Sequence, residues 1–365
     1  MKKKIKILRK YYLKLIKLIF EIIYGKIKFD EKLIVKLDQK LIKLKKDKVN
    51  DYEYYFYAIK KARLYTDAVQ NVAVIKNNLI VDKVSFQLKD TVLLDAKNNG
   101  ILETGVRKFL QKKIKGRVLS LLQGFSGAFN YSHWLCDILP KLIILNKFIS
   151  IDSIDKILIS NIDLDFQKQS LDLLNIRKDK IINGNKIRHI FADEFIFLEH
   201  PYWKNGMNFV QTINHLPYWA IKSVRDKFID FADSKKKFPE KIFIDRSDSP
   251  YSRNQIINHD EVWSELQKAG FVKFRLAEMP FIEQITLFKN AKFIVGAHGA
   301  GLANIIFSSP GSKLLEFRSP NFDSSQWKII SEMNNMKFDY IMSKRIVNQG
   351  NGDIFVPTET MKKFL

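Results

Sequence analysis

Cysteine is almost absent from this chain, which has a single one, Cys136, in 365 residues. One cysteine excludes an internal disulfide, and no Cys/His spacing typical of a zinc site occurs, so we expect a reducing compartment. No uninterrupted apolar run approaches the roughly 20 residues that a membrane-spanning helix needs, and charges recur too often for a signal-peptide core. Disulfide-stapled, zinc-binding and membrane-spanning classes are therefore disfavoured.

Two common nucleotide-binding motifs are also missing. No G-x-x-x-x-G-K-[ST] segment occurs, and the stretch FIVGAHGAGLANIIF at 293–307 has the spacing G-x-x-G-x-G instead of the dinucleotide fingerprint G-x-G-x-x-G. P-loop chemistry and nicotinamide cofactors are therefore disfavoured. No recognised RNA- or DNA-binding motif appears either, so we expect no nucleic-acid partner.

The glycine-rich stretch follows an apolar strand and leads into an apolar helix. Gly296 closes the strand, and Gly299 and Gly301 lie in the turn beside His298, so that a ligand can approach the main chain closely. Backbone N–H groups at a helix N-terminus attract anions, and we interpret this loop as a site for nucleotide phosphate. The alternative is a turn that needs glycine only for packing, with a hydrogen-bonded histidine.

A second polar loop follows the strand KIFIDR at 241–246. Arg246 and Arg253 lie seven residues apart here, and the planar guanidinium of arginine suits phosphate. Open α/β sheets bind ligands at the carboxyl ends of their strands, where both loops are expected. The two loops therefore support each other, although either arginine alone also fits ordinary surface charge.

The third motif is GFSGAFNYSHWLCDILPKL, residues 124–142. A helix that begins near Asn130 places His133 and Asp137 four residues apart on one face. An imidazole and a carboxylate so placed suit general base catalysis, and Pro140 is expected to end or kink the helix. The alternative is a capped helix N-terminus in which Asp137 meets a surface lysine.

In this order the three motifs resemble glycosyltransferase family 61, whose bacterial members build capsular and other surface polysaccharides. The resemblance covers roughly residues 115–320 and rests on HWLCDILP, on the R-x6-R-N segment followed by Asn258 and Glu261, and on AKFIVGAHGAGLANIIF. It implies an α/β GT-B fold of two Rossmann-like lobes, a nucleotide-sugar donor held mainly by the C-terminal lobe, and inversion at the anomeric carbon.

The resemblance also implies the residues that contact the donor. These are Arg246, Arg253, His298, Gly299 and Gly301, with Asn304 and Glu316 as further contacts and Gly296 in the same loop. The loop 247–252 is longer than the family pattern, which makes Arg253 the weaker of the two arginines. Asp137 as catalytic base, with His133 beside it, is our inference from chemistry and position.

An aromatic loop, HPYWKNGMN, occupies residues 200–208. Aromatic faces stack on sugar rings, so we expect Tyr202 and Trp203 to bind the acceptor, with packing between the lobes as the alternative.

The positive charge is concentrated at the N-terminus. Residues 1–50 hold 17 Lys+Arg and 5 Asp+Glu, which is +12 of the net +23 of the chain. Within residues 1–29, lysines recur every three or four positions between apolar side chains, which predicts a basic amphipathic helix. We expect it to lie on an anionic membrane surface, which places the protein in the cytoplasm on the inner face of the cytoplasmic membrane. A helix packed on the catalytic lobes, or one pairing with a protein partner, is the alternative.

The rest of the chain divides at a polar segment, residues 232–240. We expect an N-terminal acceptor lobe over 30–235, with further helices at 30–46 and 54–66, short strands from 72 to 95 and a helix over 209–231. A nucleotide-sugar lobe follows over 236–350, where strands and helices alternate and predict a parallel, doubly wound sheet. Residues 351–365 are expected to be a tail.

The expected reaction is a single displacement in which Asp137 deprotonates the acceptor. The loop amides, Arg246 and His298 then stabilise the leaving nucleotide without a cofactor or metal. Asp163 and Asp165 flank a leucine and are interpreted as helix caps and not as a metal-binding D-x-D pair. An inactive scaffold of a polysaccharide-assembly complex and a different GT-B transferase are the alternative functions. The sugar, its nucleotide and the acceptor stay open.

Overall fold

The structure is a computed structural model. It describes residues 2–30, 38–43, 53–67, 71–90, 92–122, 129–202, 207, 208, 212, 215–247, 253–321, 324–343 and 352–365. The chain forms two compact units, which we call unit 1 (Met1–Phe129, Asp137–Leu164 and Leu171–Thr212) and unit 2 (Asn130–Cys136, Asp165–Ser170 and Ile213–Leu365). Both contain helices and strands, so the chain is of the mixed α/β class that the sequence predicts.

Unit 1 contains one ten-stranded sheet in the part of the chain that is described. Its strands are β1 (Asp38–Lys43), β2 (Glu53–Thr66), β3 (Asn71–Lys76), β4 (Leu79–Ile80), β5 (Phe86–Lys89), β6 (Val92–Leu94), β7 (Lys112–Ser120), β8 (Lys156–Ile159), β9 (Ile181–Asn183) and β10 (His189–Leu198). Its helices are α1 (Lys2–Tyr24), α2 (Ile101–Thr104) and α4 (Leu139–Leu145), while α5 (Asp165–Leu173) is shared with unit 2. Short 3₁₀ turns occupy Asp82–Val84, Ala96–Asn98, Ile151–Ser153 and Lys178–Lys180.

The sheet of unit 1 is mixed. Its strand order is β6-β5-β3-β2-β10-β7-β8-β9, with β1 on β2 and β4 on β3. The pairs β10·β7, β7·β8 and β8·β9 are parallel, whereas β2 pairs with β1, β3 and β10 in antiparallel fashion. A Rossmann-like lobe has a parallel sheet, so this unit differs from the expected lobe in its antiparallel half.

Two segments predicted as helices are strands. Residues 54–66 belong to β2, whose Ile59 lies opposite Phe195 of β10. The helical prediction there is wrong because the segment holds four tyrosines, one phenylalanine and one isoleucine, which favour a pleated, half-buried surface. Of the predicted helix 30–46, residues 38–43 form β1, and the remainder after residue 30 lies outside the described residues.

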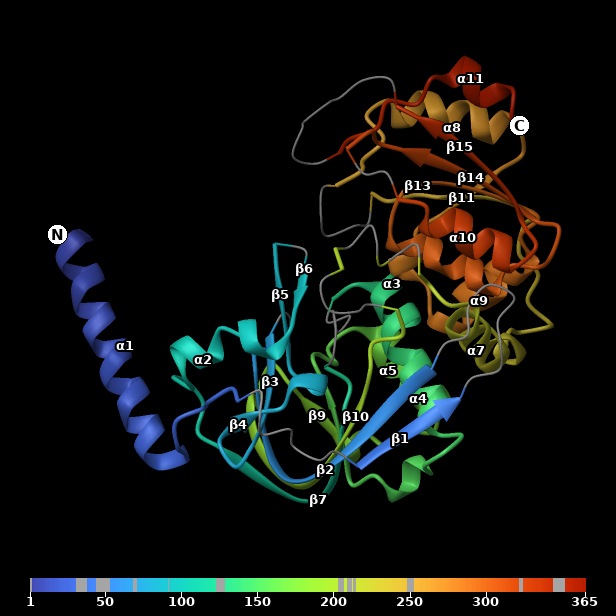
Figure 1. Cartoon of the computed structure of the whole chain (residues 1–365). Coiled ribbons are helices and arrows are strands. Elements are labelled where there is room, and N and C mark those ends of the chain that lie inside the picture. Colours follow the sequence, from blue (N-terminus) through green and yellow to red (C-terminus); the bar gives the residue numbers. More distant parts are fainter. Residues whose placement is uncertain are drawn as a thin grey trace. The chain divides into compact units, whose positions relative to one another are not determined.

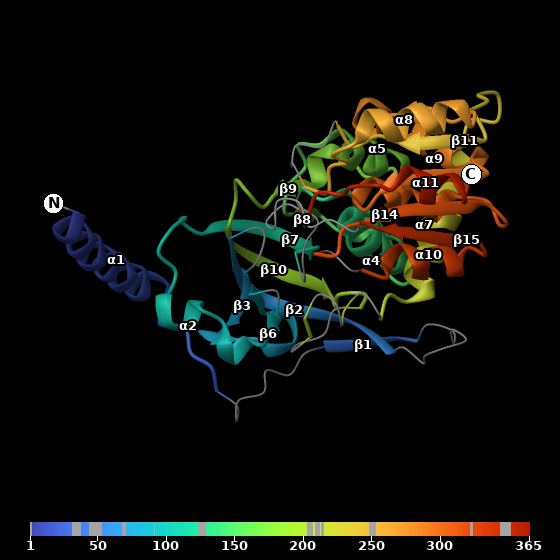
Figure 2. The same ribbon diagram turned by 90° about the horizontal axis from the view of Figure 1, so that it is seen from above.

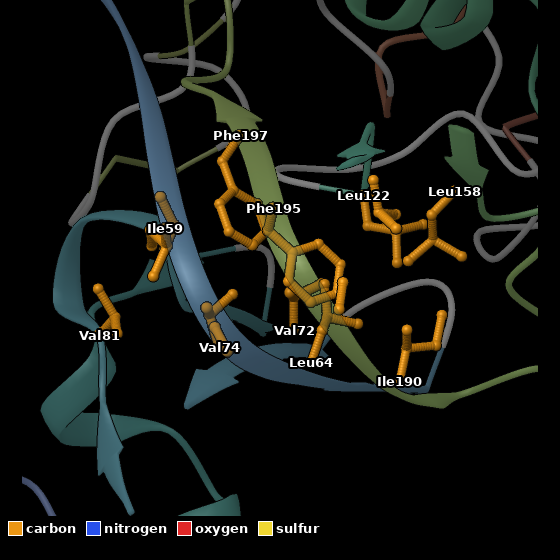
Figure 3. Packing of buried hydrophobic residues seen from close by; sticks show 14 of the residues in the cluster. Ile59, Leu64, Val72, Val74, Val81, Leu122, Leu158, Ile190, Phe195 and Phe197 are labelled. Atoms are coloured by element: carbon orange, nitrogen blue, oxygen red, sulfur yellow. The ribbon is translucent and has the colours of Figure 1, made fainter. Parts of the chain in front are cut away.

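The core of unit 1 lies against β2, β3 and β10. Figure 3 shows Phe195 and Phe197 of β10 close to Ile59 and Leu64 of β2. The rings of Phe195 and Phe197 stack with centroids 5.3 Å apart. Fully burying one such side chain contributes about 1.5–3 kcal/mol, so this cluster fixes the pairing of the long strands.

Unit 2 has a five-stranded parallel sheet, which confirms the prediction for the C-terminal lobe. Its strands are β11 (Lys241–Ile244), β12 (Val272–Phe274), β13 (Phe293–Ala297), β14 (Lys313–Arg318) and β15 (Lys337–Met342), in the order β12-β11-β13-β14-β15. Its helices are α3 (Tyr131–His133), α7 (Tyr218–Phe228), α8 (His259–Lys268), α9 (Phe281–Asn290), α10 (Gln326–Met333) and α11 (Thr358–Lys362), and 3₁₀ segments occupy Ile229–Phe231, Leu276–Glu278 and Ala300–Phe307. Figure 1 shows α8 and α11 over one face of this sheet and α9 and α10 over the other.

Local signals set the ends of the helices in unit 2. Gly270 follows α8 with φ +84°, and its N–H donates to the carbonyl of Gln267 while that of Phe271 donates to Leu266. This left-handed C-terminal turn favours glycine, as the sequence predicts. At the start of α3, the side chain of Asn130 accepts from the N–H groups of Ser132 and His133, so Asn130 is the predicted cap.

The boundaries of unit 2 differ from the expected lobe 236–350. Helix α7, expected in the N-terminal lobe, belongs to unit 2, because Arg225 donates to the carbonyls of Ile306 and Ser308. The expected tail also belongs to it: Val356 and Met361 are buried in the core beside the sheet. Apolar side chains spaced along residues 352–365 account for this packing.

Helix α1 is amphipathic and ends against the sheet of unit 1. Phe20 packs with Ile27 and Ile101, and Figures 1 and 2 show the C-terminal end of α1 leading into that unit. Ten large apolar side chains along α1 are exposed: Ile5, Ile7, Leu8, Tyr11, Tyr12, Leu15, Leu18, Ile19, Ile22 and Ile23. None of the described helices is both long enough and apolar enough to span a membrane.

Candidate functional site

In unit 2 the glycine loop and Arg246 lie against each other. A Cβ placed on Gly299 would come 1.3 Å from Nη1 of Arg246, so the guanidinium occupies the space where a side chain would stand. The φ of Gly299 is 167°, which any residue adopts. A larger residue at this position would therefore displace the guanidinium of Arg246. The sequence prediction that the two loops converge is correct for Arg246.

Arg253 is placed differently from Arg246. The side chain of Arg253 is exposed, and its backbone carbonyl accepts a hydrogen bond of 3.3 Å from Nη2 of Arg246. The guanidinium of Arg246 is half-buried, and only the main chain of Arg253 is shown to meet it. The structure therefore orients Arg246 through residue 253, and it does not show the two guanidinium groups converging.

His298 belongs to a buried charged cluster. Its Nδ1 lies 2.5 Å from Oε1 of Glu316, and Nε of Arg318 donates to Oε2 of the same carboxylate at 2.7 Å. Glu316 has no exposed surface, and the guanidinium of Arg318 lies over the rings of Phe338 and Tyr340 at 5.2 and 4.7 Å. Glu316, predicted as a donor contact, is thus positioned to orient His298.

Asn304 is another predicted donor contact whose surroundings are internal. It is fully buried, its Oδ1 accepts from the hydroxyl of Tyr131 at 2.6 Å, and its Nδ2 donates to Gln284 Oε1 and to the carbonyl of Gly301. These bonds join the segment after the glycine loop to α3 and α9. Asn304 therefore stabilises the glycine loop through hydrogen bonds to the interior of unit 2.

Two groups around the loops escaped the sequence analysis. Asn254, with φ +53°, donates from Nδ2 to the carbonyl of His298 at 3.2 Å and so links the arginine loop to the glycine loop. Asp245 accepts from Ser247 and Arg275 and faces His259. Burial raises the pKa of Asp245, but these hydrogen bonds and the nearby histidine outweigh it and hold the pKa below its usual value.

In unit 1 the predicted base Asp137 lies within a short π-helix. Residues Trp134–Ile138 form this wider turn between α3 and α4, and the helical run continues through Pro140 to Leu145. Proline lacks an N–H and its ring crowds the carbonyl four residues earlier, so a wider turn accommodates it. The expected break at Pro140 is therefore a local change of helix type.

The carboxylate of Asp137 is held by side chains of unit 1. It has no exposed surface, the hydroxyl of Tyr202 donates to Oδ1, and Nε2 of His200 lies 3.4 Å from Oδ2. Lys141, also fully buried, feels the charge of Asp137, but burial dominates and lowers the pKa of Lys141 to about 8. Tyr202, predicted to bind an acceptor, is thus a partner of Asp137.

The remaining predicted residues are placed only in part. His133 is half-buried on α3 and belongs to unit 2, whereas Asp137 belongs to unit 1. The imidazole shown beside Asp137 is that of His200, which the sequence analysis passed over although it begins the aromatic loop HPYW. Trp203 lies outside the described residues.

Metal-ligating side chains do not gather within the described part of the chain: no group of three or more His, Cys, Asp or Glu residues there has the proximity to hold an ion. Asp165 is the first residue of α5 and pairs with Lys168 at 3.2 Å.

Comparison with known families covers most of these residues, but not Glu316 or Arg318. The family described as Glycosyltransferase 61 matches residues 131–315, from α3 to β14. The chain belongs to the glycosyltransferase 61 family. Within this family member, the match includes the HWLCDILP segment, both arginines and the complete glycine loop, and it leaves α1 and most of the antiparallel strands of unit 1 outside.

Characterised relatives of this family member match over short stretches. A beta-1,2-xylosyltransferase of Arabidopsis thaliana is 27% identical over 99 residues, which is 24% of this chain and 18% of the relative. Beta-1,2-xylosyltransferase RCN11 of Oryza sativa subsp. japonica is 26% identical over 92 residues, 25% of this chain and 17% of the relative. The chain thus spans less than a fifth of the length of these plant relatives.

Among solved structures, the iron-containing dodecameric glycosyltransferase TibC from enterotoxigenic E. coli H10407 aligns over 82% of each chain, with 12% identity and a TM-score of 0.30. A similarity this low carries no argument about fold or chemistry.

Proposed function

We propose that this protein is an inverting glycosyltransferase that moves a hexosyl or pentosyl group from a nucleotide sugar to a glycan or lipid-linked acceptor in bacterial surface polysaccharide synthesis. Membership of the glycosyltransferase 61 family supports the reaction class. The observation that carries the proposal is the guanidinium of Arg246 lying on the main chain of Gly299, at the carboxyl end of parallel strand β13. A guanidinium against glycine backbone suits a diphosphate.

The donor diphosphate gains charge as it leaves the sugar. Arg246 and the N–H groups of the glycine loop supply fixed positive partial charges for that oxyanion. Glu316 accepts from Nδ1–H of His298 and so fixes the orientation of that ring beside the glycine loop. We propose that these groups act without a cofactor or metal.

The acceptor is activated by Asp137 in this proposal. The acceptor hydroxyl loses its proton to the carboxylate, its oxygen forms the bond to the anomeric carbon, and the nucleoside diphosphate departs with the electrons of the broken bond. The hydroxyl of Tyr202 already donates to Asp137, so it marks where an acceptor hydroxyl would bind. The positive charge of Lys141 favours the ionised carboxylate that a base requires.

We further propose that the two units correspond to the lobes of a GT-B enzyme. The parallel sheet of unit 2 supports this, and the mixed sheet of unit 1 is a departure from the usual lobe. We also propose peripheral attachment of the protein to the inner face of the cytoplasmic membrane through α1. Its lysines and exposed apolar side chains support attachment to an anionic surface.

A thermal-shift panel tests the donor site. The purified chain is melted with UDP, GDP, CMP, ADP or NAD, with and without magnesium. Saturation at about 100 times Kd adds roughly 2.7 kcal/mol, enough to raise Tm by a few degrees. We expect a shift with one nucleotide that disappears in Arg246→Ala and His298→Ala.

Arg177→Ala is the matched control, because that arginine forms an exposed ion pair with Asp179 in unit 1. If the thermal shift were also lost in this variant, the shift would not report nucleotide binding at the proposed site. Absence of a shift with every nucleotide would favour the inactive scaffold, and a shift with NAD alone would indicate a different nucleotide-dependent enzyme.

A further inference from the structure

A basic loop of unit 1 exposes two apolar side chains at its tip. The loop is RKFLQKK, residues 107–113, between α2 and the body of β7. Phe109 and Leu110 are 37% and 74% exposed, and the lysines on both sides, Lys108, Lys112 and Lys113, are exposed as well. No acidic residue occurs in the loop. Two adjacent exposed apolar side chains between lysines form an amphipathic tip, the combination that binds at a membrane interface.

The backbone that presents this tip is held in an uncommon conformation. Phe109 has φ +62°, which a bulky residue rarely adopts and which persists only when surrounding contacts enforce it. Nδ1 of His189 lies 3.2 Å from the carbonyl of Phe109, and the guanidinium of Arg188 lies 5.2 Å from its ring centroid. Contacts from neighbouring residues of unit 1 therefore hold the tip in this conformation.

The protonation state of His189 fits this role. Burial lowers its pKa to about 4, so the ring is neutral at pH 7. A carbonyl only accepts, so Nδ1–H donates to Phe109 and Nε2 is left to accept from the side-chain amide of Gln111, 3.4 Å away. One neutral imidazole thus holds the loop on both sides of Leu110.

The same contacts connect the loop to α1. The N–H of Gln111 donates to the hydroxyl of Tyr24 at 3.1 Å, and the ring of Tyr24 meets His189 edge-on with centroids 4.9 Å apart. Nearer the middle of α1, Nζ of Lys17 donates to the carbonyl of Glu103, which lies in α2. The end of α1 and the loop are therefore neighbours within unit 1.

We propose that loop 107–113 and α1 form one lipid-binding surface for an anionic bilayer, with Phe109 and Leu110 inserted among the headgroups. This rests on the proposed peripheral attachment through α1 and adds a second, independent contact. Charge complementarity favours anionic lipid: the loop lysines match acidic headgroups, and an apolar tip gains nothing from a nucleic-acid backbone. A second copy of this surface would meet it with like charge.

Vesicle sedimentation of the full chain tests the proposal. Vesicles of phosphatidylcholine alone are compared with vesicles that also contain phosphatidylglycerol. We expect binding only to the latter, a loss of about 10-fold or more in Leu110→Ser, and about 5-fold for each of Lys112→Gln and Lys113→Gln. These side chains are exposed, so Tm should not change.

The matched control is Lys147→Gln with Phe148→Ser, an adjacent exposed lysine and phenylalanine that follow α4 in unit 1. This control should bind as the wild type does. The double change Leu8→Ser with Leu15→Ser weakens only the contribution of α1 to vesicle binding. Combining it with Leu110→Ser should reduce vesicle binding further than either change does.

Several results would overturn the inference. Unchanged binding in the Leu110→Ser, Lys112→Gln, Lys113→Gln triple variant, with loss in the α1 variant, would leave attachment to α1 alone. Equal binding to both vesicle types would remove the anionic partner. A triple variant that becomes monomeric where the wild type self-associates without vesicles would assign the surface to a second copy. No vesicle binding by the wild type would refute membrane attachment itself, while the nucleotide panel would still test the donor site.

Discussion

Both units contain a buried histidine beside a buried carboxylate, and the third partner differs. In unit 2 the pair His298 and Glu316 is joined by Arg318, whereas in unit 1 the pair His200 and Asp137 is joined by Lys141. Arginine keeps its charge at any ordinary pH, but the pKa of Lys141 is lowered to about 8. One cluster is thus a fixed electrostatic support, and the other can change its charge.

The surroundings of the two pairs point to different tasks. His298 follows a parallel strand and adjoins a glycine loop that already holds Arg246, an arrangement that suits a leaving diphosphate. Asp137 lies in a π-helical turn and accepts a hydrogen bond from the hydroxyl of Tyr202, an arrangement that suits the removal of a hydroxyl proton. In our proposal, the same pair of residue types therefore acts on the donor in unit 2 and on the acceptor in unit 1.

The largest expected effect is that of Asp137→Asn. Loss of a general base lowers kcat by about 100-fold to 10,000-fold, while the nucleotide-induced thermal shift should persist. Release of nucleoside diphosphate from the sugar donor, with the nucleotide found in the panel, measures turnover. Asp179→Asn, an exposed carboxylate in the same unit, is the control. Full turnover in Asp137→Asn would show that this residue is not the base. The proposed difference in task between the two histidine–carboxylate pairs would then be wrong.

Gly299→Ala should weaken nucleotide binding by about 10-fold to 100-fold, because the new methyl displaces the guanidinium of Arg246 and its charged hydrogen bonds. Titration calorimetry measures the affinity. In an Arg246→Ala background the space is empty, so the same glycine change should add little. Additive losses would show that Gly299 acts independently of Arg246.

Glu316→Gln should lower nucleotide affinity about 10-fold and leave kcat at saturating donor nearly unchanged, since it loosens His298 and removes the charge that Arg318 faces. Glu278→Gln is an exposed control in unit 2. If Glu316→Gln instead lowered kcat with affinity intact, the two pairs would share one role.

The smallest expected effect is a pH dependence specific to unit 1. The pKa of Lys141 is about 8 in the folded protein and 10.5 without the fold, so the unfolded chain binds more protons between these values. The free energy of unfolding should therefore rise with pH through this residue, by about 1 kcal/mol from pH 8 to pH 9. Urea unfolding of the wild type and Lys141→Met measures it; equal pH slopes would contradict a buried ammonium.

Much of unit 2 was predictable because its information is local. Alternating strand and helix patterns give the parallel sheet, Asn130 and Gly270 mark helix ends, and glycine spacing locates the loop. Unit 1 was less predictable. Its long strand β2 combines aromatic residues that favour a strand with a spacing that also fits a helix, and pairing with β1, β3 and β10 stabilises the strand.

The candidate site residues were likewise predictable where they belong to a local sequence motif. Arg246 and His298 stand in recognisable segments, and the structure brings their loops together. His200 escaped notice because its carboxylate partner, Asp137, belongs to a distant segment of the chain. Lys141 and Arg318 lie close in sequence to their carboxylates, but their importance comes from burial, which the sequence does not show. Contacts between distant segments leave no periodic signal in the sequence.

The π-helical turn at Trp134–Ile138 makes this helix tolerant of a change in chain length. A π-helical turn behaves like an α-helix that has gained one residue, and the surplus is absorbed in a single turn. Removing Ile138, which separates Asp137 from α4, would restore a regular α-helix and rotate Asp137 relative to α4 by about 100°, one residue's advance. The orientation of the proposed base is therefore encoded by an insertion as much as by the identity of its side chain.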